Sequence, residues 1–266
     1  MSPAVRKLFT SMAALTASAL AVLGPTLSAV PASSTSGSTF SVLQMNLCLS
    51  GQAGCYDSAD QPAILDEAAA QVAEHDPSAV TLNETCRADA AELARRAGYH
   101  LSFATVDYGG APLPCIDPRG RGVFGIAVLT RDDVAASRDR AFGVQADPEE
   151  RRWLCAITDR GVTVCTAHLS TRYSAGERAA NDAGCRELQQ VLARQEAVGT
   201  TFFGGDVNRQ SSCAPATMWA TQDAAASQSA GVQHVYGSGA LDPLSVSVAE
   251  ASYTDHDFLF AAASAR

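Results

Sequence analysis

The chain has 266 residues, of which 47% are apolar and 18% are charged, and it carries a formal net charge of −9. This composition is typical of a globular protein and excludes a disordered or collagen-like chain. The acidic balance disfavours long-range attraction of nucleic acid, because a polyanion would have to be held locally by arginine and bound metal.

The N-terminal segment has the pattern of a secretory signal peptide. Arg6 and Lys7 precede an apolar run from Leu8 to Leu23, and small residues follow that run. We therefore predict a signal peptide over residues 1–32. A membrane anchor is the alternative, but the run includes Ser and Thr residues and is only marginally long enough to span a bilayer.

The rest of the chain fits a short flexible linker over residues 33–39 and one large domain over residues 40–266. Removing the leader takes away Arg6 and Lys7 and no acid, so the net charge falls from −9 to −11 and no lysine remains. No later segment is comparably long without charges, so we expect no stable membrane span. We expect a secreted, extracellular protein that is a monomer.

Apolar periodicity and breaker residues predict the elements in chain order. Helices are expected over residues 61–75, 88–97 and 175–197. Strands are expected over residues 40–48, 78–82, 99–106, 123–130, 152–158, 162–168, 200–203, 232–236, 244–248 and 258–261. Strands and helices alternate in the first half and strands cluster afterwards, which predicts an α/β protein with more than one sheet layer.

Eight cysteines, all of them after the predicted leader, indicate an oxidising compartment. No C-x-x-C pair occurs, so zinc is a poor explanation for them. Cys155 and Cys165 lie five residues either side of Arg160, and a hairpin turning there would set them opposite each other across two strands. Elsewhere a bridge between Cys48 and Cys55 would close a small loop, and the pairs that then remain are Cys86–Cys115 and Cys185–Cys213.

Polar side chains stand where several predicted strands begin or end. They are Asn46, Glu84, His168, Asp206, Asn208, Asp255 and His256. Each one alone is equally well read as a surface acid, a core-edge histidine or a turn former, but their shared setting favours one rim of the sheets, where binding groups collect. Carboxylates hold a hard cation such as Mg²⁺, a histidine moves a proton, and amides bind phosphate oxygens. The set indicates hydrolysis of a phosphate ester.

Six segments resemble, in order, motifs of the endonuclease/exonuclease/phosphatase (deoxyribonuclease I-like) superfamily. They read FSVLQMNLCLSG, PSAVTLNETC, GVFGIAVLTR, VTVCTAHLS, FFGGDVN and TDHDFL and extend over essentially the whole chain after the leader. The chain resembles a secreted bacterial member of this superfamily. The resemblance implies a four-layer αββα sandwich of two packed mixed β-sheets flanked by helices. It also implies a phosphodiesterase that needs Mg²⁺, or Mn²⁺ in its place, held by Asn46, Glu84 and Asp255.

The catalytic roles implied by the resemblance fall on five residues. His256 would take the proton of the attacking water with the assistance of Asp255. Asp206 would orient the nucleophile or serve the leaving group. Asn208 and His168 would stabilise charge on the phosphoryl oxygens.

Two positions depart from the superfamily pattern. Gln233 stands in VQHVYGS where an aspartate usually pairs with the catalytic histidine, and Asn83 stands where glutamine usually precedes the glutamate. A glutamine can orient an imidazole by a hydrogen bond but cannot stabilise its cation by charge. Asp242 or Asp257 is the alternative partner.

Two substrate classes are compatible with the sequence. Nucleic acid is the first choice, and a phospholipid head group such as that of sphingomyelin is the second. Arg119, Arg121 and Arg131 are candidates for a local phosphate grip. A secreted binding protein on a catalytically weakened scaffold is the alternative that Gln233 motivates. A serine hydrolase is disfavoured because no Gly-x-Ser-x-Gly elbow occurs.

Overall fold

Two six-stranded sheets form the framework of this computed structural model, which describes residues 39–52 and 60–265. In spatial order the first sheet consists of β13 (Leu241–Ala249), β14 (Phe258–Ala265), β1 (Thr39–Asn46), β2 (Ala79–Cys86), β6 (Phe124–Thr130) and β3 (His100–Thr105). The second consists of β11 (Met218–Gln222), β12 (Gln233–Ser238), β10 (Thr201–Asp206), β9 (Thr163–His168), β8 (Arg152–Thr158) and β7 (Val134–Ala141). A short hairpin pairs β4 (Asp107–Tyr108) with β5 (Ala111–Pro112).

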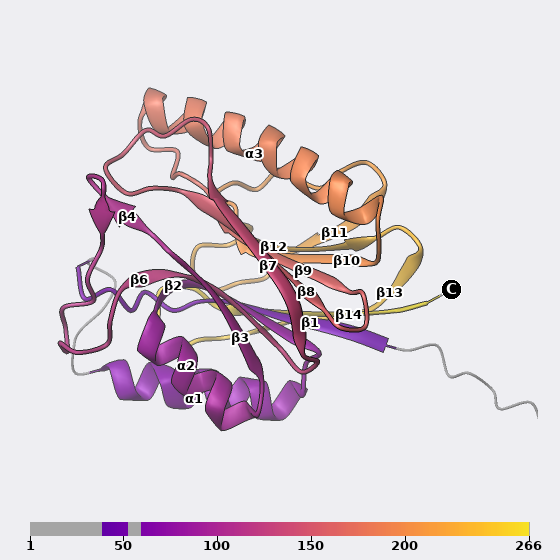
Figure 1. The fold of residues 1–266 in the computed structure, drawn as a ribbon, viewed down its shortest axis with the longest axis horizontal. Helices are drawn as coiled ribbons and strands as arrows, with labels where there is room; N and C mark the ends of the chain where they lie inside the picture. The colour runs from indigo at the N-terminus through magenta and orange to yellow at the C-terminus, as the bar shows by residue number, and fades with distance from the viewer. Residues whose placement is uncertain (1–38, 53–59, 266) are drawn as a thin grey trace, which may run out of the picture. The chain divides into compact units, whose positions relative to one another are not determined.

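Both sheets are mixed, because β1 runs parallel to β2 and β9 parallel to β10 while the other pairs are antiparallel. The helices are α1 (Gln61–His75), α2 (Arg87–Ala97) and α3 (Ala175–Glu196). Helices α1 and α2 pack on the first sheet, and α3 packs on the second (Figure 1). Separate apolar clusters fill the space between the sheets and beneath the helices. The four-layer αββα sandwich predicted from the sequence is confirmed.

Local sequence explains where the helices begin and end. In α1, Ile64, Leu65 and Val72 lie on one buried stripe, the spacing expected of an amphipathic helix. Ser174 and Glu177 form a reciprocal capping box that starts α3. Helix α2 ends at Gly98, whose φ of 71° is readily adopted only by glycine.

Two glycines allow close packing beside the predicted site, Gly204 between the two sheets and Gly205 within the second sheet. A Cβ at Gly204 would lie 2.2 Å from the hydroxyl oxygen of Thr81, on the opposite sheet. A Cβ at Gly205 would lie 2.5 Å from the carbonyl oxygen of Ala167. Only glycine fits at these two positions, which immediately precede Asp206.

Most predicted elements are present, with differences at their ends. Strand β1 starts at Thr39, which was predicted to belong to the linker, while the predicted leader and residues 33–38 lie outside the described residues. Strands β2 and β10 run further than predicted, so Glu84 and Asp206 lie within strands. In the two large sheets, the strands for which we identified no sequence signal are β7 and β11. Both are edge strands, and β7 is largely exposed and polar; the short strands β4 and β5 were not predicted either.

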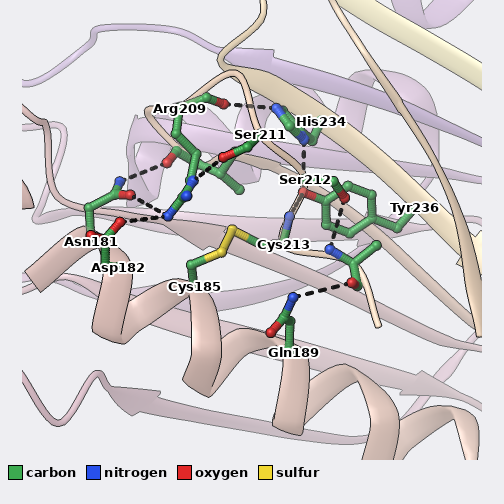
Figure 2. The surroundings of a disulfide bond; sticks show 12 residues. Asn181, Asp182, Cys185, Gln189, Arg209, Ser211, Ser212, Cys213, His234 and Tyr236 are labelled. Atoms are coloured by element: carbon green, nitrogen blue, oxygen red, sulfur yellow. Dashed lines mark hydrogen bonds and ion pairs between the residues drawn. A yellow bond between two sulfur atoms is a disulfide. The ribbon is translucent and has the colours of Figure 1, made fainter. Parts of the chain in front are cut away.

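Three of the four cysteine pairs agree with the structure. Cys155 faces Cys165 across β8 and β9 with a Cα–Cα distance of 4.0 Å, and the other two bridges are Cys86–Cys115 and Cys185–Cys213. The second of these ties α3 to the segment after β10 (Figure 2). The Cys48–Cys55 prediction lies outside the described residues, because Cys55 is not described. Over the described ranges, no helix combines the length and apolar character needed to cross a membrane.

Candidate active site

The predicted site residues come together at one rim of the sandwich. Asn46, His168 and Asp206 are the last residues of β1, β9 and β10, so the strand ends of both sheets supply them. All three are buried. His256 reaches the same place from the loop before β14, and the hydroxyl of Thr254 in that loop donates to the backbone oxygen of Asn46 at 3.1 Å. This bond fastens the loop to the first sheet.

Two site residues adopt left-handed backbone conformations that are uncommon outside glycine. Glu84 has a φ of 52° and lies where the register of β2 against β6 shifts. Asn208 has a φ of 50°, and its backbone N–H donates to Oδ1 of Asp206 at 2.8 Å. Such conformations persist only where the surroundings impose them, and strand irregularities of this kind redirect side chains beside active sites.

Asn46 joins the two carboxylates at the centre of the site. Its Nδ2 donates to Oε1 of Glu84 at 3.0 Å and to Oδ2 of Asp206 at 3.1 Å. The Nε2 atom of His168 lies 3.7 Å from Oε1 of Glu84 and 3.9 Å from Oδ2 of Asp206. The side-chain amide of Asn208 faces the same strand end, where it donates to the backbone oxygen of Leu169 at 2.9 Å.

His256 lies beside the carboxylate of Asp206. Its Nε2 is 3.7 Å from Oδ2 of Asp206 and 4.0 Å from Oδ1 of Asp255. Its Nδ1 is buried and has no hydrogen-bond partner among the described residues. The imidazole is therefore placed next to Asp206 but is not fixed in one orientation by a hydrogen bond.

Burial sets the electrostatics of the site. It raises the pKa of Glu84 to about 7, despite the hydrogen bond from Asn46, because a buried carboxylate is poorly solvated. Burial and the positive charge of Arg151 hold the pKa of His168 well below its ordinary value. His168 is therefore a neutral imidazole at neutral pH.

Arg151 is a site residue that we did not identify from the sequence. Its Nη1 lies 2.9 Å from Nδ1 and 3.1 Å from Nε2 of His168, and 3.0 Å from Oε1 of Glu149. The arginine is 8% exposed, and its Nε is buried without a partner in the described part of the chain. A guanidinium can only donate, so at most one of the two ring nitrogens accepts from Nη1, and the tautomer of His168 decides which one. The only signal in the sequence is a pair of arginines at the start of a predicted strand.

The two positions that depart from the superfamily pattern serve the interface between the sheets. Oδ1 of Asn83 accepts from Nε2 of Gln44 at 2.8 Å and from the backbone N–H of Asp206 at 2.7 Å. The Nε2 of Gln233 donates to the backbone oxygen of Asp257, and its Oε1 accepts from Gln44 at 3.2 Å. Among the described residues none of its hydrogen bonds reaches His256, so the orienting bond predicted from the sequence is not formed.

Neither of the alternative carboxylates takes that role either. The carboxylate of Asp257 accepts from the backbone N–H groups of Ser227 and Ala251 and so holds two loops. Asp242 lies on β13, at an exposed position of the edge strand.

Two of the three arginines predicted to grip phosphate are engaged elsewhere. Arg121 is buried and pairs with Asp89 at 2.5 Å, and Arg131 pairs with Asp76 and with backbone oxygens. Each of these two arginines is paired with a carboxylate that lies far from it in the sequence, so the sequence shows no sign of the pairing. Arg119 is exposed.

Together the fold and the site define a class of protein: an αββα sandwich with acidic, amide and imidazole side chains gathered at one rim. Residues 56–256 match the model of the Endonuclease/Exonuclease/phosphatase family, so the chain belongs to that family. Membership supports a phosphoric ester hydrolase in general.

Similar folds occur among solved structures. An endonuclease/exonuclease/phosphatase from Beutenbergia cavernae DSM 12333 has a TM-score of 0.65 and 20% identity over 85% of this chain and 72% of that chain. The human Nocturnin catalytic domain with bound sulfate anion has a TM-score of 0.62 and 16% identity over 86% and 95%. D. rerio TDP2 complexed with single strand DNA product has a TM-score of 0.60 and 14% identity over 85% and 99%. Comparison with curated proteins gave no significant match.

Proposed function

We propose that this protein is a secreted, Mg²⁺-dependent phosphodiesterase that cleaves nucleic acid. The observation that carries the proposal is the meeting of Glu84, His168, Asp206 and His256 around one point, with separations of 3.7–3.9 Å between the imidazoles and the carboxylates. Family membership supports the reaction class. The neighbour solved with single strand DNA product supports the choice of nucleic acid.

The donor set fits a magnesium ion. Mg²⁺ prefers oxygen ligands and usually binds through one or two carboxylates while keeping several waters. Oδ1 of Asp255 is buried without a hydrogen-bond partner in the described part of the chain, and Glu84 carries a largely buried carboxylate. Among the described residues no group of three or more His, Cys, Asp or Glu side chains is arranged to hold a metal ion, so the proposed magnesium ion would take at most two such ligands from the chain and keep several waters. Glu84 and Asp255 are the residues that would hold the ion through carboxylate oxygens. Asn46 would position Glu84, because its Nδ2 donates to Glu84 and its Oδ1 accepts from the backbone N–H of Cys48.

The chain's own residues account for water activation and charge stabilisation. His256 takes a proton from the water molecule whose oxygen attacks phosphorus. Asp206, whose Oδ2 lies 3.7 Å from Nε2 of His256, orients that water. As the new P–O bond forms, the bond to the leaving oxygen breaks, and that oxygen takes a proton from solvent. Asn208 and the neutral His168 stabilise charge on the remaining phosphoryl oxygens. Bound Mg²⁺ would supply positive charge to the phosphate and to the leaving oxygen.

Arg151 is a positioning residue in this proposal. It contacts His168 and not the carboxylates that flank the reacting atoms, and it holds the ring as a neutral acceptor. Secretion is supported by three disulfides, which persist in oxidising compartments.

The experiment is hydrolysis of bis-p-nitrophenyl phosphate by the purified protein with Mg²⁺ and with EDTA. We expect turnover only with Mg²⁺ or Mn²⁺, and we expect Mg²⁺ to raise the unfolding temperature, because a ligand that binds only the folded state stabilises it. Glu84→Gln should abolish both effects, whereas Glu74→Gln, on the exposed face of α1, should keep them. Full turnover after exhaustive chelation would contradict the proposal.

A further inference from the structure

A hollow is lined in part by Asn208. It has a volume of about 470 Å³, and Arg172, Asn208, Arg209, Gln210 and Ser211 are among the residues that line it. This volume lies within the range of about 300–1,000 Å³ that is usual for small-molecule sites. No carboxylate is among the lining residues. In a chain with a net charge of −9, the hollow is therefore a local concentration of positive charge.

The two arginines converge on the same acceptors of α3. Nη1 of Arg172 donates to Asp182 at 2.6 Å and to Asn181 at 2.9 Å. Nη1 of Arg209 donates to the same oxygens at 2.9 Å and 3.2 Å (Figure 2). Two guanidiniums share one carboxylate, so one positive charge stays uncompensated, and the Nη2 groups of both have no partner among the described residues. These groups are available to an anion.

Arg209 is held in place by a buried network behind it. Nε2 of His234 donates to the backbone oxygen of Arg209 at 2.9 Å, and its Nδ1 accepts from the hydroxyl of Tyr236 at 2.8 Å. That hydroxyl accepts from the backbone N–H of Cys213 at 2.9 Å, and Cys213 is bridged to Cys185 (Figure 2). This arrangement fixes the segment from Arg209 to Cys213 before any ligand binds, which lowers the entropic cost of binding.

The loop that carries Arg172 also presents an aromatic ring to solvent. Tyr173 follows Arg172 directly and is 89% exposed, the highest exposure of the large hydrophobic side chains in the described ranges. Nη1 of Arg178 donates to the backbone oxygens of both residues at 3.1 Å, which holds the loop against α3. Proteins that bind single strands combine arginines along the phosphates with aromatic rings on which bases stack.

We infer that Arg172, Tyr173 and Arg209 form a flanking-nucleotide subsite, which binds the nucleotide next to the phosphate under attack in single-stranded nucleic acid. The two arginines contact the neighbouring phosphate, and Tyr173 stacks on the unpaired base. The inference rests on the proposed function and narrows its substrate class. A phosphocholine head group fits poorly, because its quaternary ammonium would face two guanidiniums.

The test is equilibrium binding of a fluorescently labelled oligo-deoxythymidine in EDTA, where binding is measured without turnover. Arg172→Gln and Arg209→Gln should each weaken binding about tenfold, the loss of one charge-assisted contact. Each should also reduce the slope of log affinity against log salt by about 0.7, the value for one phosphate contact on a single strand. Tyr173→Ala should weaken binding about tenfold without changing the salt slope.

Matched controls are Arg138→Gln and Tyr108→Ala, which change exposed side chains on β7 and β4. Both substitutions remove bonds to Asn181 and Asp182, but Arg209→Gln also removes the bond from Nε to Ser211 within its own loop. Arg172→Gln, with Arg172→Lys expected to restore part of the affinity, is therefore the cleaner variant. Variants that bind as tightly as wild type, or controls that weaken binding equally, would overturn the subsite.

A second measurement separates the subsite from the proposed function. The ratio of kcat/KM for the oligonucleotide to that for bis-p-nitrophenyl phosphate should fall about tenfold in Arg172→Gln. Loss of all hydrolysis in wild type with normal oligonucleotide binding would overturn the proposed function and leave the subsite. Hydrolysis of the small ester and of sphingomyelin vesicles, without oligonucleotide binding, would overturn the subsite and leave the reaction class.

Discussion

Replacing Arg151 with glutamine separates the contribution of this residue to stability from its contribution to catalysis. Its side chain is 9% exposed and bonds to Glu149 and His168. Removing one partner of a buried ion pair usually costs about 3–5 kcal/mol, because the other charge stays buried and unpaired. Glu149 is 23% exposed and partly solvated, so we expect a loss near the lower end, about 3 kcal/mol.

The catalytic effect follows from the second bond. Without the positive charge of Arg151, the pKa of His168 should rise, although burial still holds it below its ordinary value. The ring also loses the donor that fixes it, so kcat should fall about tenfold, equivalent to ~1.4 kcal/mol of lost transition-state stabilisation. Urea denaturation measures the first effect, and the pH dependence of kcat measures the second.

The matched control is the neighbouring arginine. Arg152→Gln removes ion pairs to Asp139 and Glu150, both at 3.1 Å. Its backbone pairs with that of His168, but among the described residues its side chain has no hydrogen bond or ion pair to a site residue. It should cost less stability and leave the pH profile in place. If Arg151→Gln has the stability and the pH profile of wild type, the buried contact with His168 does not exist in solution and the reasoning is refuted.

Three further predictions test the framework. Gly205→Ala should destabilise by about 1–3 kcal/mol, because its Cβ would lie 2.5 Å from a carbonyl oxygen, whereas Gly143→Ala, with its nearest neighbour at 3.5 Å, should cost less. Burial raises the pKa of Asp223 from 3.8 to about 6, so the folded state binds the proton more tightly and stability falls as pH rises through that window. Asp223→Asn should therefore be more stable relative to wild type at pH 7 than below pH 4 in urea denaturation. Peptide mapping without reductant should recover Cys155 joined to Cys165, and free thiols at both positions would contradict the pairing.

The fold was largely predictable because its elements carry their own periodicity. Helix α1 and strand β8 have the predicted bounds, and each buries the apolar face that the sequence shows. Strand β7 escaped detection because an edge strand that is exposed on most of its length needs no apolar alternation. The C-terminal ends of β2 and β10 were predicted too early. Polar residues near these ends, Asn83 and Asp206, join a buried hydrogen-bond network, and polar residues after an apolar run look like the end of a strand in the sequence.

The site was predictable where short motifs encode it and not where distant segments meet. His168, Asp206 and His256 each lie in a local motif, and the structure brings them together. Arg151 precedes β8 without a motif, and its function depends on a side-chain contact with His168, the cross-strand partner of its neighbour Arg152. The sequence also could not show that Gln233 does not bond to His256. The side chain of Gln233 bonds instead to Gln44 on β1 and to Asp257 in the loop before β14, which are distant in the sequence.

The most direct test of the central claim is the rate of hydrolysis of bis-p-nitrophenyl phosphate by His256→Ala in the presence of Mg²⁺. A general base contributes about 10²–10⁴-fold, so kcat should fall by at least about 10²-fold while the unfolding temperature stays near that of wild type. His100→Ala, which changes an exposed histidine paired with Asp133, should keep the wild-type rate. A His256→Ala rate within about twofold of wild type would contradict the assignment of this rim as the active site.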